Sequence, residues 1–224
     1  MATQLDFEEQ EQLDQLKASW KQYGNLITWA LVLALAAYVG WNRWGAWQRD
    51  QGEKAASLYD AVDKAVQAGD AAVASRVFAD MKERYPRATF TQQAGLAAAR
   101  LEVEKGQPEA ARANLTWVAE KAGDDDYRSI ARLRLAGMLL DDKKYDDALK
   151  QIDAVDAVAF AALAADRRGD VLMAQGKTEE AKAAYQKAWA AMDAKVDYRR
   201  LIEAKLNVMG AAPAPAASAA GASK

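Results

Sequence analysis

An uncharged stretch near the N-terminus constrains this chain more than any other feature. Residues 22–42 lie between Lys21 and Arg43 and contain no Asp, Glu, Lys or Arg. In an α-helix these 21 residues extend roughly 32 Å, about the thickness of the hydrocarbon core of a bilayer. Tryptophans, which favour membrane–water interfaces, lie at or beyond its two ends: Trp20, Trp41, Trp44 and Trp47. We therefore expect one membrane-spanning helix over residues 22–42, in contact with the lipid bilayer.

A buried core helix and a cleaved signal peptide are the alternatives for this stretch. A core helix rarely lacks charge for so long or carries Trp at both ends. Ala34-Leu35-Ala36 resembles a small-residue cleavage site, but a signal peptide needs a basic start. The residues before the stretch include five acids: Asp6, Glu8, Glu9, Glu11 and Asp14. We expect an uncleaved anchor, preceded by a tail over residues 1–21 and followed by a juxtamembrane segment over residues 43–54.

The charges around the span leave its orientation open. Lys17 and Lys21 precede it, whereas Arg43, Arg49 and Lys54 follow it. Two basic residues against three do not decide which end faces the cytoplasm, and acidic residues contribute little to this rule.

Composition predicts a mostly helical chain and excludes several kinds of site. Alanine occupies 53 of the 224 positions, with only 13 Gly and 4 Pro, which favours helix. The chain has no His and no Cys, which excludes Ser-His-Asp and Cys-His catalysis, His or Cys zinc sites and disulfides. Because 30 Lys and Arg nearly balance 32 Asp and Glu, no overall field attracts nucleic acid. We expect no cofactor, no metal site, no nucleic-acid partner and no small-molecule substrate.

Residues 55–209 repeat a pattern of two apolar helices joined by a tight turn. A small residue near the start of each second helix marks the four units: Ala74, Ala111, Ala148 and Ala181. Glycine ends the first helix of three units: Gly69, Gly106 and Gly176. The third unit has Lys143-Lys144-Tyr145 at its turn instead, and its second helix is expected to run from Ala148 through Ile152 to Val155. A last helix, roughly residues 197–208, would cap the open end.

This pattern predicts an all-α fold, in which a single transmembrane helix is followed by an α-solenoid of about four helical hairpins and a capping helix. One hairpin cannot bury its apolar face alone, so neighbouring hairpins must stack. The units resemble the tetratricopeptide repeat, whose period is about 34 residues, and the best match runs from Arg168 through Gly169 to Tyr185. A non-repeating helical bundle is the alternative. Residues 210–224 are Ala, Pro, Ser and Gly with one Lys, and predict a disordered tail.

Two charged clusters in the repeat region have structural and functional interpretations. Asp124-Asp125-Asp126 is interpreted as the cap of a helix that begins near Tyr127, because acids complement the helix dipole there. The second cluster lies on the first helices of the last two units: Arg134, Asp166, Arg167, Arg168 and Asp170. It is interpreted as ion pairs that position adjacent hairpins, with a polar patch contacting a partner as the functional alternative.

Three stretches carry a more specific resemblance: Gly40-Trp41-Asn42-Arg43-Trp44, Leu133-Arg134-Leu135-Ala136, and Ala165 to Ala181. With the acidic tail and the four units, they make residues 1–209 resemble the YfgM family, the ancillary subunits of the bacterial Sec translocon. The resemblance implies a single-pass inner-membrane protein with a cytoplasmic N-terminus and a periplasmic repeat domain. It also implies association with SecYEG and with a membrane-anchored periplasmic chaperone of the PpiD type.

The predicted function is therefore protein–protein interaction beside a translocation channel, with no catalytic residues. We expect the groove formed by the first helices of the hairpins to engage a chaperone or an emerging polypeptide. The candidate partner-binding residues are Tyr59, Asp63, Gln93, Arg100, Arg134 and Asp170. A scaffold for envelope or cell-division assembly is the main alternative. An enzyme would need Lys or carboxylate catalysis, for which a pair of close, buried carboxylates in a cleft would be the sign.

Overall fold

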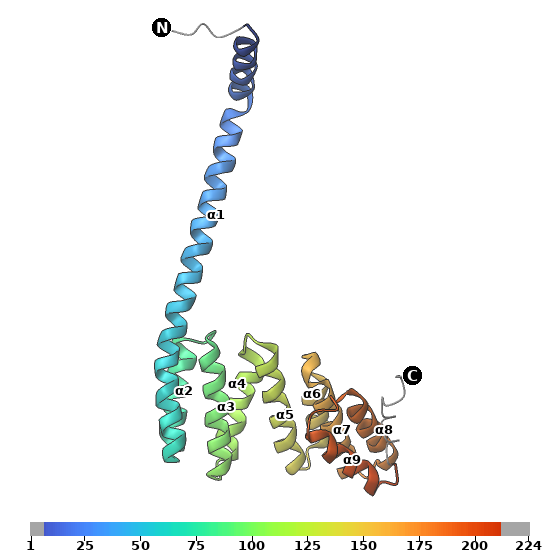
Figure 1. Ribbon diagram of the computed structural model, residues 1–224. Helices are drawn as coiled ribbons and strands as arrows, with labels where there is room; N and C mark the ends of the chain where they lie inside the picture. Colours follow the sequence, from blue (N-terminus) through green and yellow to red (C-terminus); the bar gives the residue numbers. More distant parts are fainter. Residues whose placement is uncertain (1–6, 212–224) are drawn as a thin grey trace, which may run out of the picture. The chain divides into compact units, whose positions relative to one another are not determined.

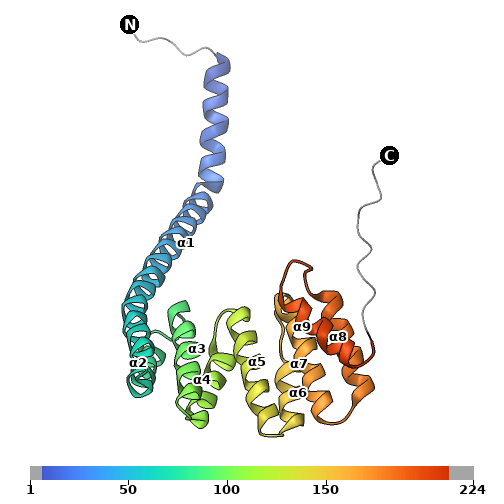
Figure 2. The ribbon, with the colours of Figure 1, turned by 60° about the horizontal axis from the view of Figure 1, so that its bottom comes forward.

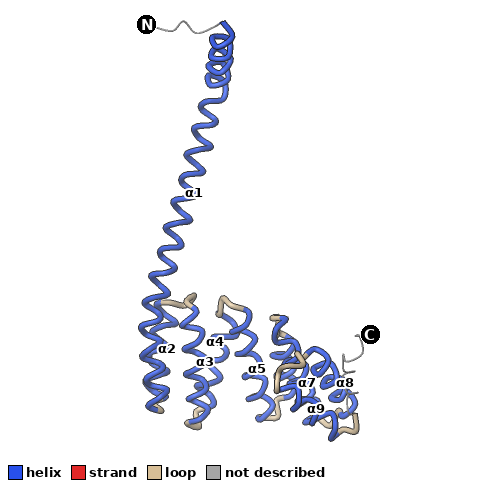
Figure 3. Tube along the Cα trace, in the orientation of Figure 1, coloured by secondary structure: helices blue, strands red, loops and turns tan. Residues whose placement is uncertain are grey.

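A computed structural model describes residues 7–211 as α-helices joined by short loops (Figure 3). These residues fall into two compact units, which meet between Gln51 and Gly52. Helix α1, Phe7–Ala68, contributes residues to both units. Most of the tail predicted for residues 210–224 lies outside the described residues.

The first unit consists of the N-terminal part of α1 and contains the uncharged stretch. Its large apolar side chains are exposed along the helix: Leu26, for example, is 70% exposed and Leu33 is 65% exposed. Among the described residues, α1 contains the one segment long and apolar enough to cross a membrane, and only 6% of its most apolar window is buried. A core helix would be mostly covered by protein, so this exposure argues against a buried core helix and favours contact with lipid.

The second unit is a row of four helical hairpins and one further helix. The C-terminal part of α1 pairs with α2 (Ala71–Arg84), α3 (Thr89–Glu104) with α4 (Pro108–Lys121), and α5 (Asp125–Asp141) with α6 (Tyr145–Asp153). A 3₁₀ turn, Val158–Phe160, leads into α7 (Ala161–Ala174), which pairs with α8 (Thr178–Ala191). Helix α9 (Tyr198–Val208) packs on α8 at the end of the row. Figures 1 and 2 show α2 to α8 following one another in chain order, as predicted for stacked hairpins, with α9 beside α7 and α8.

The same turn closes all four hairpins, although the third has no glycine there. In that turn the N–H of Lys143 donates to the carbonyl of Leu140 (2.9 Å), and the N–H of Lys144 donates to Leu139 (2.8 Å). One residue of each turn adopts the left-handed conformation. Its φ is 61° at Lys143, compared with 68° at Gly69, 71° at Gly106 and 76° at Gly176. The third turn thus keeps the hydrogen bonds to the last carbonyl groups of α5, although a lysine at positive φ is less favourable than a glycine.

Small residues let the helices approach closely. The four alanines that mark the repeat have no exposed surface, as expected where two helices pack closely. Two helical glycines are equally constrained: a Cβ on Gly95 would lie 2.6 Å from Val118 Cγ2, and one on Gly169 would lie 2.4 Å from Tyr185 Cε1. The core therefore depends on backbone approach at these positions as much as on large side chains.

The third hairpin departs from the predicted boundaries in two places. Helix α6 ends at Asp153, so the prediction that it continues to Val155 was wrong. Arginine side chains occupy this helix end, because Arg132 donates to the carbonyl of Ala154 and Arg168 pairs with Asp153. Helix α5 begins at Asp125, earlier than expected, and Asp124 caps it by accepting a hydrogen bond from the N–H of Asp126 (2.8 Å).

Candidate functional site

A groove of about 810 Å³ crosses the first helices of the last three hairpins. These helices are neighbours, since α5 contacts both α3 and α7. Leu115 of α4, Phe160 of the 3₁₀ turn and Tyr198 of α9 also line the groove. The lining residues are Ala99, Arg100, Val103, Glu104, Leu115, Ile130, Leu133, Arg134, Gly137, Met138, Asp141, Phe160, Leu163, Asp166, Arg167 and Tyr198.

The floor of the groove is apolar and partly accessible. Val103 on α3 is 50% exposed and lines the groove. Leu133 and Met138 are half-buried there. An apolar recess with charged residues at its edge is typical of a surface that binds peptides or helices of other proteins.

Each of the three first helices places one arginine at the groove: Arg100 on α3, Arg134 on α5 and Arg167 on α7. Arg100 pairs with Glu104 on its own helix (2.9 Å), and Arg167 lies 3.4 Å from Asp170. Arg134 donates to the backbone carbonyl of Leu96 (3.0 Å) and has no carboxylate partner among the described residues. Burial of its guanidinium lowers the pKa of Arg134, and the positive charge of Arg100 lowers it further.

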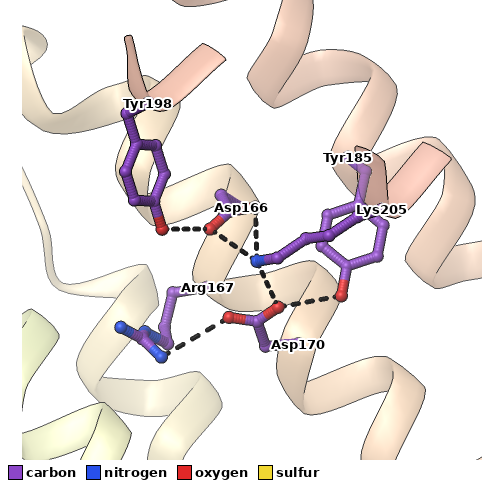
Figure 4. A network of polar contacts seen from close by, with 6 residues as sticks. All are labelled: Asp166, Arg167, Asp170, Tyr185, Tyr198 and Lys205. Carbon is purple, nitrogen blue, oxygen red and sulfur yellow. Dashed lines mark hydrogen bonds and ion pairs between the residues drawn. The ribbon is translucent and has the colours of Figure 1, made fainter. Parts of the chain in front are cut away.

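Beside the groove, a polar network fixes α9 to α7 (Figure 4). The ammonium of Lys205 donates to both oxygens of Asp166 (2.9 Å each) and to Asp170 Oδ1 (2.6 Å). The hydroxyl of Tyr198 donates to Asp166 Oδ2 (2.8 Å), and that of Tyr185 donates to Asp170 Oδ1 (2.8 Å). Burial raises the pKa of Tyr198 to about 12, aided by its hydrogen bond to Asp166. Burial also raises the pKa of Tyr185, with a second contribution from Asp170.

Asp166 and Asp170 are the close carboxylates that could have indicated catalysis, but their contacts point to a structural role. Asp166 is only 1% exposed. Each of the four carboxylate oxygens engages at least one donor from Lys205, Tyr185, Tyr198 or Arg167. A carboxylate already occupied in this way is poorly suited to accept a proton from a substrate. The pair anchors the capping helix.

The predicted ion pairs between neighbouring hairpins are confirmed in part. Arg168 of α7 pairs with Asp153 at the end of α6. Asp166 and Asp170 pair with Lys205 of the capping helix rather than with the preceding unit. Arg134, assigned to the same cluster, makes its hydrogen bond back to α3.

The six candidate partner-binding residues lie in three places. Arg100 and Arg134 line the groove, and Asp170 belongs to the network that holds α9. Of the other three, Tyr59 and Asp63 lie on α1 and Gln93 lies on α3. The Tyr59 ring lies 5.7 Å from that of Phe90, and burial followed by the charge of Asp63 raises the Tyr59 pKa. Asp63 accepts from Gln67 (2.6 Å).

Gln93, the remaining candidate, donates to the hydroxyl of Tyr127 (2.6 Å). Tyr59, Asp63 and Gln93 do not line the groove. They stay predictions as partner-binding residues, as do the other three.

Sequence reasoning missed Tyr198 and Lys205 as residues of the site, and it placed Arg167 in the charged cluster without naming it among the six candidate partner-binding residues. Arg167 carried a usable signal, because Arg100, Arg134 and Arg167 are separated by 34 and 33 residues, which is close to the repeat period. Lys205 carried none, since its partner lies 39 residues earlier in the chain.

Comparison with known proteins agrees with this architecture. A family model described as a tetratricopeptide repeat-like domain matches residues 17–211. A Neisseria gonorrhoeae protein named "Ancillary SecYEG translocon subunit" is 32% identical over 201 residues, which cover 89% of this chain and 96% of that protein. Proteins of the same name from Haemophilus influenzae and Escherichia coli are 30% and 28% identical, over 81% and 80% of this chain and 88% and 85% of their own lengths.

The match extends over nearly the whole length of both chains, and the family model includes the candidate membrane span as well as the repeats. It confirms the resemblance drawn from the sequence. The chain belongs to the family of ancillary SecYEG translocon subunits, whose fold is a tetratricopeptide repeat-like domain.

Proposed function

We propose that this protein is a single-pass inner-membrane subunit that associates with SecYEG and links it to a periplasmic chaperone of the PpiD type. In this proposal the N-terminus is cytoplasmic and the solenoid is periplasmic. The names of the relatives support the Sec association, and the exposed apolar helix supports membrane insertion. The chaperone link and the orientation follow from the family resemblance.

The groove is the observation that carries the proposal. It offers an apolar floor with arginines from α3, α5 and α7, which suits binding of a polypeptide rather than chemistry on a small substrate. The neighbouring carboxylates are occupied by Lys205 and two tyrosines. The protein therefore acts by holding partners together.

Membrane anchoring strengthens such binding. Two weak contacts, one in the membrane and one in the groove, become intramolecular once the first has formed. The effective concentration of the second contact then rises, and overall affinity exceeds that of either contact alone. A groove of moderate affinity is sufficient for a subunit that must also release its clients.

Affinity purification from membranes solubilised in mild detergent tests the association. We expect SecY, SecE and SecG to be recovered with the full chain, together with a membrane-anchored chaperone. The matched control replaces residues 22–42 with an unrelated transmembrane helix, which separates contacts of the span from contacts of the solenoid. Recovery of cell-wall enzymes without any Sec subunit would favour the scaffold alternative and contradict the proposal.

The absence of cysteine from the chain makes the orientation directly testable. Single-cysteine variants Ser19→Cys and Lys177→Cys are treated with a membrane-impermeant maleimide. We expect Lys177→Cys to react once the outer membrane is permeabilised, and Ser19→Cys to react only after the inner membrane is opened. The reverse pattern would place the solenoid in the cytoplasm.

A further inference from the structure

Some charged side chains of the groove have an oppositely charged partner and one does not, and this difference indicates what kind of ligand the groove binds. Glu104 is paired with Arg100, and Asp166 is paired with Lys205. Arg134, on the middle helix α5, has only the carbonyl of Leu96 as a hydrogen-bond partner among the described residues. A guanidinium has five N–H donors, so most of its hydrogen-bonding capacity is left for water or a ligand.

Several features make Arg134 a site for an anion. Its guanidinium is partly desolvated, and Arg100 is near enough for its positive charge to lower the pKa of Arg134 further. Like charges brought together cost free energy, and an incoming carboxylate relieves this repulsion while accepting up to two parallel N–H bonds. Asp141, the remaining acid of the lining, lies two turns along α5 and is exposed to solvent.

The apolar residues around Arg134 favour a ligand with apolar surface over a small, fully hydrated anion. Ile130, Leu133 and Met138 lie on the same helix and line the same groove. Burying their exposed surface favours a ligand that brings apolar side chains. The ligand must therefore combine apolar surface with a carboxylate.

We infer that the groove binds an apolar segment of a partner protein and that an Asp or Glu side chain of this segment contacts Arg134. Arg100 and Arg167, on the helices to either side, line the same groove, but each is paired with an acid on its own helix, so Arg134 is the arginine of the lining that is left to bind this carboxylate. The inference rests on the proposed function, because it specifies what kind of segment a Sec subunit, chaperone or client presents. It predicts selection for an acidic residue among hydrophobic ones, rather than for hydrophobicity alone.

Peptide binding to the full chain in nanodiscs tests this inference. The probes are fluorescein-labelled peptides of about ten residues, with leucines spaced by Gly and Ser and a single central Glu, Gln or Lys. We expect the Glu peptide to bind about tenfold more tightly than the Gln peptide, since a charge-assisted bond replaces a neutral one, and the Lys peptide to bind most weakly. Fluorescence anisotropy, corrected with empty nanodiscs, gives the Kd values. Raising the salt concentration should reduce the Glu preference.

Variants assign the preference to Arg134. Arg134→Met should abolish the tenfold difference, Arg134→Lys should restore part of it, and Arg134→Glu should favour the Lys peptide. Arg87→Met, at an exposed arginine outside the groove lining, is the matched control and should leave all Kd values unchanged. Equal Kd values for the Glu and Gln peptides on the wild-type chain would overturn the inference without any variant. So would the lack of saturable binding, or a preference that survives in Arg134→Met. Sec recovery from membranes is measured separately, so the proposed function can stand if the inference fails.

Discussion

Two buried carboxylates, one in each half of the solenoid, are held in different ways. Glu102 is fully buried between α2, α3 and α4, where it accepts hydrogen bonds from Ser75 and from Asn114 (2.8 and 2.9 Å). These hydrogen-bond donors are neutral, and Lys82 interacts with Glu102 through its charge rather than through a hydrogen bond. Asp166, almost as buried, is held by the ammonium of Lys205 from the capping helix.

The difference follows the size of the apolar core around each group. Helices α2 to α4 share a large cluster that includes Phe78 packed edge-on against Trp117, with ring centres 5.5 Å apart. Helix α9 contributes two fully buried side chains, Ile202 and Leu206. Neutral hydrogen bonds are sufficient where packing already holds the helices together, whereas a terminal helix with a small core gains a charged anchor. The stability of the C-terminal end of the solenoid, beside the groove, therefore depends most on electrostatic interactions.

The largest expected effect is that of Lys205→Met, which leaves Asp166 buried without its cation. Removing one partner of a buried ion pair costs about 3–5 kcal/mol. Because each repeat contacts only its neighbours, the loss should be local. Hydrogen exchange should show reduced protection in α8 and α9 and unchanged protection in α2 to α4. Lys187→Met, at an exposed position of α8, is the control, and an equal loss along the whole solenoid would contradict a local role for the ion pair.

A smaller effect is expected from Gly169→Ala. The added Cβ would lie 2.4 Å from the Tyr185 ring, so the ring must move and weaken its hydrogen bond to Asp170. Overpacking of this kind costs about 1–3 kcal/mol, measured as the free energy of unfolding in urea. Gly137→Ala is the control, since its Cβ would have no atom within 4 Å and a helix gains from alanine. Equal stability changes in the two variants would disprove the close contact.

Tyr198→Phe removes one hydrogen bond to Asp166 and should cost about 1 kcal/mol. In the folded protein the pKa of Tyr198 is raised from 10.0 to about 12. The stabilisation by the neutral phenol is therefore complete below pH 10 and is lost as the pH rises through about 12. The difference in tyrosinate absorbance between wild type and variant should show a midpoint near pH 12, and a midpoint at 10 would be inconsistent with the network.

The smallest effect is expected from Glu102→Gln. Ser75 and Asn114 both donate to Oε1, and a glutamine carbonyl can accept both bonds. The free energy of unfolding should change by less than about 1 kcal/mol, in contrast to the larger loss for Asp166→Asn, which leaves Lys205 short of one anion. Similar losses of unfolding free energy for Glu102→Gln and Asp166→Asn would show that the two carboxylates are not held in different ways.

The sequence predicted the hairpins well because their signals are local. Glycine at a helix end and alanine at a close approach are fixed by backbone geometry within a few residues. The turn at Lys143 was placed correctly, but the sequence did not indicate that a lysine there adopts the left-handed conformation. The prediction failed at the end of α6, where arginines from α5 and α7 bind the helix end. These outcomes depend on tertiary contacts that no local pattern encodes.

The groove could be predicted only in outline. Arg100 and Arg134 were assigned to the first helices of their hairpins, and the structure places both in the groove. Tyr59 and Gln93 lie on such helices too, but they pack against Phe90 and Tyr127 instead. Because the chain is so rich in alanine, its apolar periodicity does not show which face of a helix is covered by neighbouring helices. Which candidates line the groove therefore depends on which hairpin each belongs to, and this is seen only in the structure.

Site-specific photocrosslinking in native membranes is the measurement that tests the central claim most directly, namely that the groove holds the partner. A photoreactive residue is placed at Arg134 in the groove or at Lys187 on the exposed face of α8. We expect adducts with a Sec subunit or a periplasmic chaperone from position 134 and none from position 187. Adducts from position 187 alone would show that partners bind the other face of the solenoid, and would contradict the claim that the groove holds them.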